Sequence, residues 1–391
     1  MTRVISQVCI VGGGFGGLYT ALSLSRYSLV KTGCCKVTLI EPKSRFLFSP
    51  LLYELLTKEL EPWEIAPSYQ KLLQNTSITW IQDQVQQINL SKRTLRLAQY
   101  PPQNYDYLVL TGGRQAKAPP TFTYPYQTFR SLADAEEILT RIESLLRDRS
   151  RISIAIVGAG ANGVELACKL SDRLGARGKI FLIDQNQGIL KNFNSGIQKA
   201  ANKALAARNI EICLNSKIQA TAADTLKISS PERQFTQNFE QIIWTVGTAS
   251  HPWVKQLNCQ KNSWGQLLTC PTLQLIDYPE VLALGDIAEI QQSKTKIVPN
   301  TAQAAYQQAP LAARNLLALM QGHRLKGFVY YHLGDMLTLG KGKGLISSFG
   351  FNLAGSLGGL LRRLIYIYRL PTLRHRLQVG RKFLIKLLRH D

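Results

Sequence analysis

Short apolar runs alternate with helix-like stretches along the first half of the chain. Residues 8–11, 36–40, 152–157 and 179–183 are short, mostly apolar runs bounded by turn-forming or polar residues, a pattern typical of buried strands. A stretch with helical spacing follows the first and the third of these runs. Strands that alternate with helices predict a parallel sheet covered by helices. We therefore expect an α/β fold that contains the same strand–helix–strand unit twice.

A glycine-rich turn joins the first strand to its helix. Gly12, Gly14 and Gly17 form the pattern GxGxxG at this position, which is the context that dinucleotide binding requires. Gly12 permits a tight turn, Gly14 lets a pyrophosphate approach the backbone, and Gly17 lets the helix pack closely on the strand. Glu41 ends the next strand, where its carboxylate could accept hydrogen bonds from ribose hydroxyls. The first unit thus predicts a dinucleotide whose phosphates lie at a helix N-terminus.

The second unit repeats this arrangement. Gly158, Gly160 and Gly163 follow the strand at 152–157, and Asp184 ends the next strand 21 residues after Gly163. One dinucleotide needs one such unit, so two units predict two dinucleotides that face each other. A duplicated fold in which one site is inactive is the alternative.

Two acids of the second unit bear on its chemistry. Asp184 favours NADH, because a carboxylate repels the 2′-phosphate of NADPH; neighbouring cations could compensate, so the preference stays open (Arg173, Arg177 and Lys179). Glu165 directly follows the second glycine pattern, on the first turn of its helix. It could lie beside the nicotinamide or the flavin, or it could simply complement the helix dipole.

A third helix is predicted at residues 300–320, with Asn300 or Thr301 as its cap. Pro310 should kink it or divide it into two shorter helices. Its N-terminus carries the positive end of the helix dipole. Gln303 and Gln307 share one face of this helix, where their amides could bond a ligand or form an ordinary polar face.

The C-terminal segment is basic and apolar. The chain has a formal net charge of +22, and residues 360–391 hold nine Lys or Arg and one Asp, which favours an anionic partner. A helical apolar stripe precedes Pro371 (Leu361, Leu364, Ile365 and Tyr368), and three arginines lie outside it (Arg362, Arg363 and Arg369). Residues 381–389 form a second basic element. Basic amphipathic helices of this kind are typical of a membrane surface; packing on the protein's own core or on a partner chain is the alternative.

An uncharged run, the spacing of the cysteines and the N-terminus bear on membrane insertion, metal binding and cellular compartment. The uncharged run 344–361 contains five glycines, so we expect a loop or membrane-surface element rather than a membrane span. The seven cysteines form no CxxC pair and show no zinc-ligand spacing, which indicates a reducing compartment and no metal site. No signal peptide is expected at the N-terminus.

Several longer stretches resemble the two-dinucleotide-binding-domain flavoproteins and, within them, the type II NAD(P)H:quinone oxidoreductases. These stretches are RFLFSPLLYELLTKEL (45–60), YDYLVLTGG (105–113), VGAGANGVELA (157–167), IIWTVGTASHP (242–252), VLALGDIAEI (281–290) and AQAAYQQ (302–308). The alanine that precedes the threonine in the family's ATG motif is absent before Thr111. LGDMLTLGKGKG and RRLIYIYRLPTLRHRLQVG look like a cyanobacterial and plastid branch linked to prenylated quinones, including the demethylphylloquinone step of phylloquinone synthesis.

The resemblance implies FAD and NAD(P)H as cofactors and a role for each matching residue. The implied FAD-binding residues are Gly12, Gly14, Gly17, Glu41, Thr111, Gly285 and Asp286. The implied NAD(P)H-binding residues are Gly158, Gly160, Gly163, Asp184 and Gly247. Glu165, Gln303 and Gln307 are implied at the redox centre. There the N-terminus of the helix at 300–320 could stabilise negative charge on the reduced flavin, and the two glutamine amides could bond a quinone carbonyl. The branch has NADPH as a proposed donor, which conflicts with Asp184.

These observations together predict a three-part enzyme. We expect an FAD-binding domain at 1–120 and 250–325, an NAD(P)H-binding domain at 121–249, and a membrane-docking segment at 326–391. The expected activity is two-electron reduction of a membrane prenyl-quinone, demethylphylloquinone or plastoquinone, without proton pumping. We expect a peripheral protein on the cytoplasmic or stromal face of a membrane, with no nucleic-acid partner and with homodimerisation left open. The alternative is a non-catalytic NADH-sensing flavoprotein whose basic surface binds nucleic acid.

Overall fold

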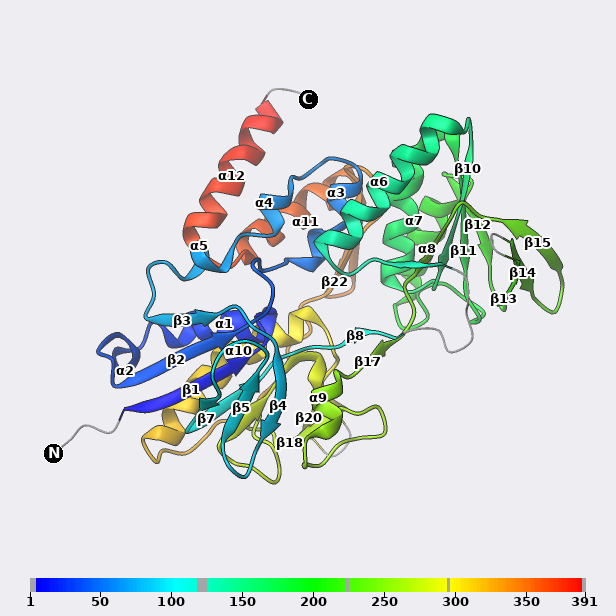
Figure 1. The fold of residues 1–391 in the computed structure, drawn as a ribbon. Coiled ribbons are helices and arrows are strands. Elements are labelled where there is room, and N and C mark those ends of the chain that lie inside the picture. Colours follow the sequence, from blue (N-terminus) through cyan, green and yellow to red (C-terminus); the bar gives the residue numbers. More distant parts are fainter. Residues whose placement is uncertain (1–4, 118–124, 223–224, 294–295, 389–391) are drawn as a thin grey trace. The chain divides into compact units, whose positions relative to one another are not determined.

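The computed structural model describes residues 5–117, 125–222, 225–293 and 296–388, which pack as two compact units (Figure 1). Unit 1 consists of the described residues of Met1–Phe46, Pro67–Gln115 and Thr248–Tyr331. Unit 2 consists of those of Leu47–Ala66, Ala116–Gly247 and His332–Asp391. Each unit contains one of the two predicted strand–helix–strand repeats, which confirms the α/β fold.

A five-stranded sheet forms the centre of unit 1, in the order β19-β7-β1-β2-β3. Its strands are β1 (Ser6–Val11), β2 (Cys35–Ile40), β3 (Ile78–Ile81), β7 (Tyr107–Leu110) and β19 (Val281–Ala283). All four neighbouring pairs are parallel. Parallel strands covered on both faces are apolar throughout, and the last four residues of β1 are accordingly buried.

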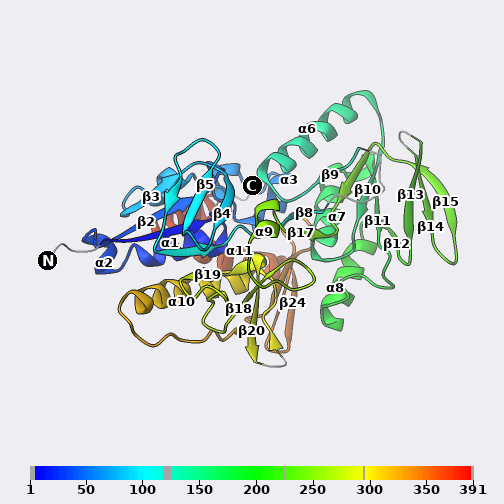
Figure 2. The ribbon, with the colours of Figure 1, turned by 60° about the horizontal axis from the view of Figure 1, so that its bottom comes forward.

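Two helices pack against each other beside this sheet. α1 (Phe15–Leu24) lies along α10 (Ala302–Met320), as Figure 2 shows. The hydroxyl of Thr301 caps α10 by accepting a hydrogen bond from the Ala304 N–H at 3.1 Å, as predicted. The predicted break at Pro310 is wrong, because α10 is continuous through it. Pro310 is exposed, and buried alanines next to it on the helix surface, such as Ala309 and Ala313, hold the helix in place by tertiary packing.

The remaining elements of unit 1 are short. β4 (Val85–Asn89), β5 (Thr94–Leu97) and β6 (Gln103–Asn104) form one small antiparallel sheet. β18 (Leu267–Thr269), β20 (Ala288–Ser293) and β21 (Lys296–Ile297) form another sheet. The short helices are α2 (Ser28–Lys31), α5 (Tyr69–Leu73) and α9 (Pro252–Gln256). β8 (Gln115–Ala116) and β17 (Thr248–Ala249) lie where the chain passes from one unit to the other.

Unit 2 has its own five-stranded parallel sheet, in the order β12-β11-β10-β16-β9. The strands are β9 (Gln127–Thr128), β10 (Ile152–Val157), β11 (Gly178–Ile183), β12 (Glu211–Cys213) and β16 (Gln241–Trp244). The helices α6 (Leu132–Asp148), α7 (Ala161–Leu174) and α8 (Ser195–Ala206) belong to the same unit (Figure 1). β13 (Lys217–Ala222), β14 (Thr225–Ser229) and β15 (Gln234–Asn238) form an antiparallel sheet beside it. Phe181 and Phe239 meet edge to face in the core between these sheets.

The C-terminal residues complete unit 2. β22 (Asp335–Thr338), β23 (Gly344–Ser348) and β24 (Phe351–Gly355) form an antiparallel sheet, followed by α11 (Ser356–Arg369) and α12 (Leu373–Leu388). The same unit includes α3 (Tyr53–Leu56) and α4 (Pro62–Ile65). The second basic element therefore begins at Leu373, earlier than predicted, and Arg389 at its predicted end lies outside the described residues.

The expectation of a loop at 344–361 is wrong, because these residues form β23, β24 and the start of α11. Their glycines permit close backbone contact. A Cβ atom on Gly358 would lie 2.6 Å from the carbonyl oxygens of Gly344 and Leu353, and one on Gly359 would lie 2.5 Å from that of Gly342. The glycine content that suggested a loop therefore reflects the packing of a helix directly on a strand.

Candidate functional site

The first glycine loop is held open by its own glycines. Gly12 has a φ of 97°, in the left-handed region that favours glycine. A Cβ atom on Gly17 would lie 1.8 Å from the carbonyl oxygen of Gly12, so a larger residue would push the helix away from the strand. Among the described residues, no atom from outside the helix and the neighbouring residues lies within 4 Å of the Cβ position of Gly14. The backbone N–H groups at this helix N-terminus can therefore be approached by an anionic group.

Side chains from neighbouring strands fix this loop. Thr111 donates its hydroxyl to the carbonyl oxygens of Val11 at 2.9 Å and Gly12 at 2.7 Å. Glu41 accepts a hydrogen bond from the Gly13 N–H at 2.7 Å, and the Tyr69 hydroxyl donates to the carbonyl oxygen of Gly13 at 2.8 Å. The carboxylate predicted to bind ribose thus lies at the loop itself.

The second loop has the same construction. Gly158 has a φ of 112°, a Cβ on Gly163 would lie 1.7 Å from the Gly158 carbonyl oxygen, and nothing lies within 4 Å of the Cβ position of Gly160. Asp184 accepts a hydrogen bond from the Ala159 N–H at 2.6 Å, as Glu41 does from Gly13. Thr245 donates to the Val157 carbonyl oxygen at 2.7 Å and so repeats the role of Thr111. Sequence reasoning missed Thr245, although it follows a strand in the same way.

The other predicted cofactor-binding glycines lie in turns. Gly247 has a φ of 79°, and its carbonyl oxygen accepts a hydrogen bond from the Lys117 N–H at 3.3 Å. Gly285 has a φ of 75° and donates its N–H to the side-chain oxygen of Gln308 at 2.8 Å. Asp286 is half-buried, and its backbone oxygen accepts a hydrogen bond from the Gln266 amide at 3.1 Å. The fully buried Gln308, which the sequence did not single out, thus ties α10 to the Gly285 turn.

Gln303 and Gln307 both contact the segment that ends unit 1. The Tyr330 hydroxyl donates to the Gln303 side-chain oxygen at 2.8 Å. The Gln307 amide donates to the Tyr331 carbonyl oxygen at 2.8 Å and accepts from the Tyr331 N–H at 3.1 Å. The predicted shared face is therefore confirmed, and it holds residues 330 and 331 against α10.

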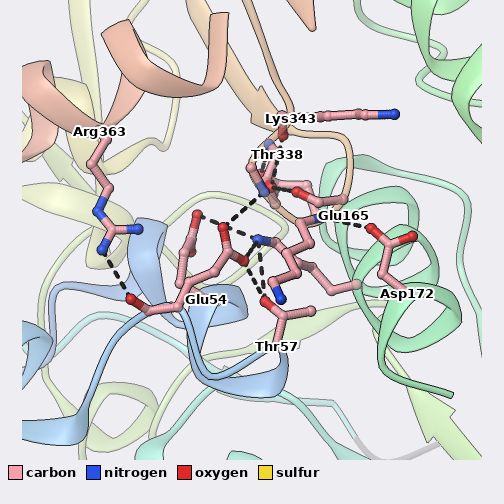
Figure 3. Close-up of polar contacts among 12 residues, drawn as sticks. Glu54, Thr57, Glu165, Asp172, Thr338, Lys343 and Arg363 are labelled. Carbon is pink, nitrogen blue, oxygen red and sulfur yellow. Dashed lines mark hydrogen bonds and ion pairs between the residues drawn. The ribbon is translucent and has the colours of Figure 1, made fainter. Parts of the chain in front are cut away.

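A cluster of charged side chains is buried in unit 2 (Figure 3). We call it the buried ionic cluster, and it consists of Glu54, Glu59, Glu165, Lys169 and Arg362. Arg362 pairs with Glu54, and Lys169 pairs with Glu59 and, at 4.0 Å, with Glu54. Arg362 also lies 3.6 Å from Glu165. Four of these side chains are less than a tenth exposed.

The backbone of β22 and of the turn after it completes the cluster. The Thr338 N–H donates to Glu165 Oε1 at 2.8 Å, and the Gly342 N–H donates to Glu59 Oε1 at 2.9 Å. Arg363 donates to the carbonyl oxygen of Glu59 at 3.0 Å. Three segments that are distant in sequence, α3 with the residues after it, α7, and residues 338–363, are thereby joined through charges and hydrogen bonds.

The pKa values of two acids in the cluster are shifted in opposite directions, because burial dominates at Glu165 and the neighbouring cations dominate at Glu54. Burial raises the pKa of Glu165 to about 7, although Arg362 and the Thr338 N–H act to lower it. Burial also acts to raise the pKa of Glu54, but the attraction of Arg362 and Lys169 holds that pKa below its ordinary value. Glu54 is therefore a fixed anion at neutral pH, whereas Glu165 can gain or lose a proton there.

The structure corrects the interpretation of the arginines on α11. Arg362 lies outside the apolar stripe, as predicted, but it is 3% exposed and faces Glu54 rather than solvent. The stripe itself is exposed at Leu361 (41%), Leu364 (46%) and Tyr368 (71%). The first turns of α12 pack on α4, since the His375 ring donates to the Glu64 carbonyl oxygen at 2.9 Å. Among the described residues, no helix is long and apolar enough to cross a bilayer.

The cysteines form no disulfide and no metal-binding group in the described part of the chain. All seven are free thiols, and no group of three or more His, Cys, Asp or Glu is placed to hold a metal ion there. Burial raises the pKa of the Cys9 and Cys168 thiols to about 12, so they stay protonated and unreactive at neutral pH.

Comparison with known proteins identifies the family. The model of the pyridine nucleotide-disulphide oxidoreductases matches residues 6–309. Demethylphylloquinone reductase NdbB of Synechocystis is 36% identical over 393 residues, which cover 99% of this chain and 97% of that protein. The type II NADH:quinone oxidoreductase of Haemophilus influenzae is 27% identical, covering 86% of this chain. The chain belongs to the type II NADH:quinone oxidoreductase family.

Two further similarities concern the sequence and the fold. An alternative NAD(P)H-ubiquinone oxidoreductase of Arabidopsis thaliana is 34% identical over 96% of this chain and 79% of that protein. The structure of NDH2 from Plasmodium falciparum in complex with NADH is 17% identical and superimposes with a TM-score of 0.85 over 97% of this chain and 98% of that one. At that identity the second likeness concerns the fold alone.

A type II oxidoreductase of this family uses FAD and NAD(P)H, and the two glycine loops fit these cofactors. Each loop leaves its middle glycine open at a helix N-terminus, and each has a strand-end carboxylate beside it. Nothing in these matches favours the nucleic-acid-binding alternative.

Proposed function

We propose that the chain oxidises NADH or NADPH and passes an electron pair, through FAD, to a lipid-borne prenylated naphthoquinone. The observation that carries the proposal is the paired construction of the two glycine loops in a member of a quinone-reducing family. A naphthoquinone is proposed because a relative at 36% identity over nearly the whole chain is named a demethylphylloquinone reductase. Bound FAD would supply the redox centre that exchanges electron pairs between the two substrates.

Asp184 supports NADH as the preferred donor in this proposal. Its carboxylate stands at the end of β11 and accepts hydrogen bonds from the backbone of Ala159 and Asn186. Those bonds fix a negative charge where a ribose would bind. A 2′-phosphate at that position would be repelled, whereas ribose hydroxyls would find an acceptor.

Glu165 is the residue that we propose holds a proton for the quinol. Its pKa of about 7 lets it be protonated or ionised near neutral pH. The Thr338 N–H and Arg362 favour the ionised form, so that the carboxyl can release its proton despite burial. Glu54 pairs with Arg362 and so holds it within the buried ionic cluster.

Gln303 and Gln307 are proposed to face the quinone while they hold residues 330 and 331. The amide nitrogen of Gln307 uses one hydrogen for the Tyr331 carbonyl oxygen and carries a second hydrogen. That hydrogen could be donated to a quinone carbonyl without bringing a charge into the site.

The docking segment is proposed to lie on an anionic membrane surface as a peripheral element. Leu357, Leu361, Leu364 and Tyr368 of α11 and Leu384 and Leu388 of α12 are between 41% and 80% exposed. The sequence between residues 336 and 390 contains eleven Lys or Arg and no acid. Exposed apolar side chains with cations around them are typical of interfacial helices. We also propose that the chain lies on the cytoplasmic or stromal face and can form a homodimer. Residues 1–120 and 250–325 would bind FAD, residues 121–249 would bind NAD(P)H, and residues 326–391 would form the docking segment.

The test is steady-state kinetics of the purified, FAD-loaded chain with NADH and NADPH against water-soluble and prenylated naphtho- and benzoquinones. We expect quinone-dependent oxidation of the nicotinamide, with NADH preferred and with prenylated naphthoquinones reduced fastest in anionic vesicles. Reduction of a disulfide, or nicotinamide oxidation that no quinone stimulates, would contradict the proposal.

A further inference from the structure

The turn between β23 and β24 leaves two phenylalanines almost fully exposed. Ser348 pairs with Phe351 across this hairpin, so its loop consists of Phe349 and Gly350. The side chains of Phe349 and Phe351 are 85% and 81% exposed. β24 is labelled in Figure 2 and leads directly into α11. Two exposed aromatic rings at a hairpin tip form an apolar point on the surface of unit 2.

Phe349 is also a poor residue for this backbone. Phe349 and Gly350 have φ values of 48° and 84°, and a type I′ hairpin turn requires positive φ at both of its central residues. Asn-Gly or Asp-Gly fits such a turn well, whereas a bulky side chain is disfavoured in the left-handed region. The folded chain therefore tolerates both a strained backbone and an exposed ring at one position. Strain of this kind points to a function outside folding.

We propose that Phe349 and Phe351 insert into the interfacial region of a lipid bilayer and form a membrane contact separate from α11 and α12. The proposal rests on the proposed function, in which the quinone is reached at a membrane. Aromatic side chains are favoured at the boundary between lipid headgroups and acyl chains. Phe349, with a positive-φ backbone on a tight turn, projects a ring from the end of the hairpin.

Charge identifies the partner as lipid. Residues 336–390 contain eleven Lys or Arg and no Asp or Glu, so the segment that includes the hairpin is attracted to anionic headgroups. Lys341 and Lys343, which precede β23, are exposed. Asp335 pairs with Ser347 next to the turn, so the attraction comes from the basic segment as a whole rather than from the tip. An exposed apolar tip in a strongly basic segment matches an anionic bilayer, which offers both a negative surface and an apolar layer beneath it.

The variants Phe349→Asn and Phe351→Thr remove the rings with residues that suit their backbones. Asn fits the left-handed turn position, and Thr suits a strand. Trp264→Ser is the matched control, because Trp264 is 75% exposed on unit 1. Binding of the full-length, FAD-loaded chain to vesicles of phosphatidylglycerol and phosphatidylcholine is measured by co-sedimentation. We expect each hairpin variant to weaken vesicle partitioning about tenfold, which corresponds to removing one buried Phe from lipid, and the control to leave it unchanged.

Thermal stability separates insertion from a structural role. If the proposal is right, Phe349→Asn leaves the melting temperature in buffer unchanged or raises it, because the turn is relieved of strain. A lower melting temperature would show that the ring packs on protein and would overturn the proposal. Unchanged vesicle binding would overturn it too. A lower oligomeric mass of the variants in lipid-free sedimentation would assign the hairpin to a second copy of the chain instead.

The test is independent of catalysis. Vesicle co-sedimentation needs no quinone, so it can succeed or fail whatever the enzyme reduces. Reduction of the water-soluble quinone 2-methyl-1,4-naphthoquinone in lipid-free buffer tests the proposed function by itself, and the hairpin variants should retain the wild-type rate there. A wild-type chain that reduces no quinone but binds vesicles through the hairpin would contradict the proposed function alone.

Discussion

The pair formed by Glu54 and Arg362 should hold the C-terminal helix α11 on unit 2. Both side chains are 4% exposed, and Arg362 is the residue of α11 that reaches the buried ionic cluster. Replacing Arg362 with Met leaves Glu54 buried with Lys169, 4.0 Å away, as its remaining cation in the cluster. Breaking a buried ion pair from one side costs about 3–5 kcal/mol. For a unit of roughly 200 residues, such a loss lowers the melting temperature by about 10 °C.

The double variant Glu54→Gln/Arg362→Met separates pairing from packing. The double variant removes both charges, so neither partner of this pair is left buried without its counter-ion. Its loss of unfolding free energy should therefore be about 2–3 kcal/mol smaller than the sum of the losses in the two single variants. Arg363→Met is the matched control. Arg363 lies next to Arg362 on the same helix but donates to a backbone carbonyl oxygen, so its loss should cost only about 1 kcal/mol.

Calorimetry of the FAD-loaded variants at pH 7.5 provides the measurement. The melting temperature should fall most in Arg362→Met. In the double variant it should lie well above that of Arg362→Met. If the two single effects simply add, or if Arg363→Met is as damaging as Arg362→Met, the reasoning about the buried pair is wrong.

Glu165, Asp184 and the first glycine loop lead to three further predictions. Burial raises the folded-state pKa of Glu165 to about 7, so its ionisation removes stability as the pH rises from about 4.5 to 7. Glu165→Gln should therefore become progressively more stable than wild type across that window, and its quinone-reduction rate should lose any step near pH 7; parallel stability curves would contradict this account. Asp184→Ser should shift the ratio of kcat/KM for NADPH to that for NADH upward by about tenfold, because a like charge near the 2′-phosphate is removed; an unchanged ratio would show that Asp184 does not face the ribose. Gly17→Ala should purify without FAD, since its Cβ would meet the Gly12 carbonyl oxygen at 1.8 Å, whereas Gly14→Ala should fold normally and bind FAD weakly. Wild-type FAD affinity in Gly14→Ala would mean that the pyrophosphate does not approach that glycine.

The parts of the fold that depend on local patterns were predictable from sequence. The two glycine loops, their strands and helices, and the Thr301 cap are specified by residues within about 30 positions of one another. Such patterns encode strand, turn and helix directly, because each residue type has a steric or hydrogen-bonding reason to be there. Pro310 is the local signal that failed, since tertiary packing of α10 on α1 outweighs the loss of one hydrogen bond.

The buried ionic cluster could not be predicted in the same way. Glu54 and Arg362 are 308 positions apart, and helical periodicity placed Arg362 on a polar face without showing that this face would be covered. The role of Glu165 was predicted from its position directly after the second glycine loop. Its pKa could not be predicted, because it depends on burial, on the Thr338 N–H of β22 and on Arg362. The glycines of 344–361 show the same limit, because their composition alone does not distinguish a loop from tight packing of a helix on a strand.

The central claim is that a flavin in this chain takes electrons from a nicotinamide and gives them to a quinone. Anaerobic stopped-flow spectroscopy tests it directly by following flavin absorbance near 450 nm in the purified protein. The account predicts bleaching on addition of NADH and full return of the absorbance when a prenylated naphthoquinone is mixed in. A protein without flavin absorbance, or a bleached flavin that no quinone restores, would contradict it.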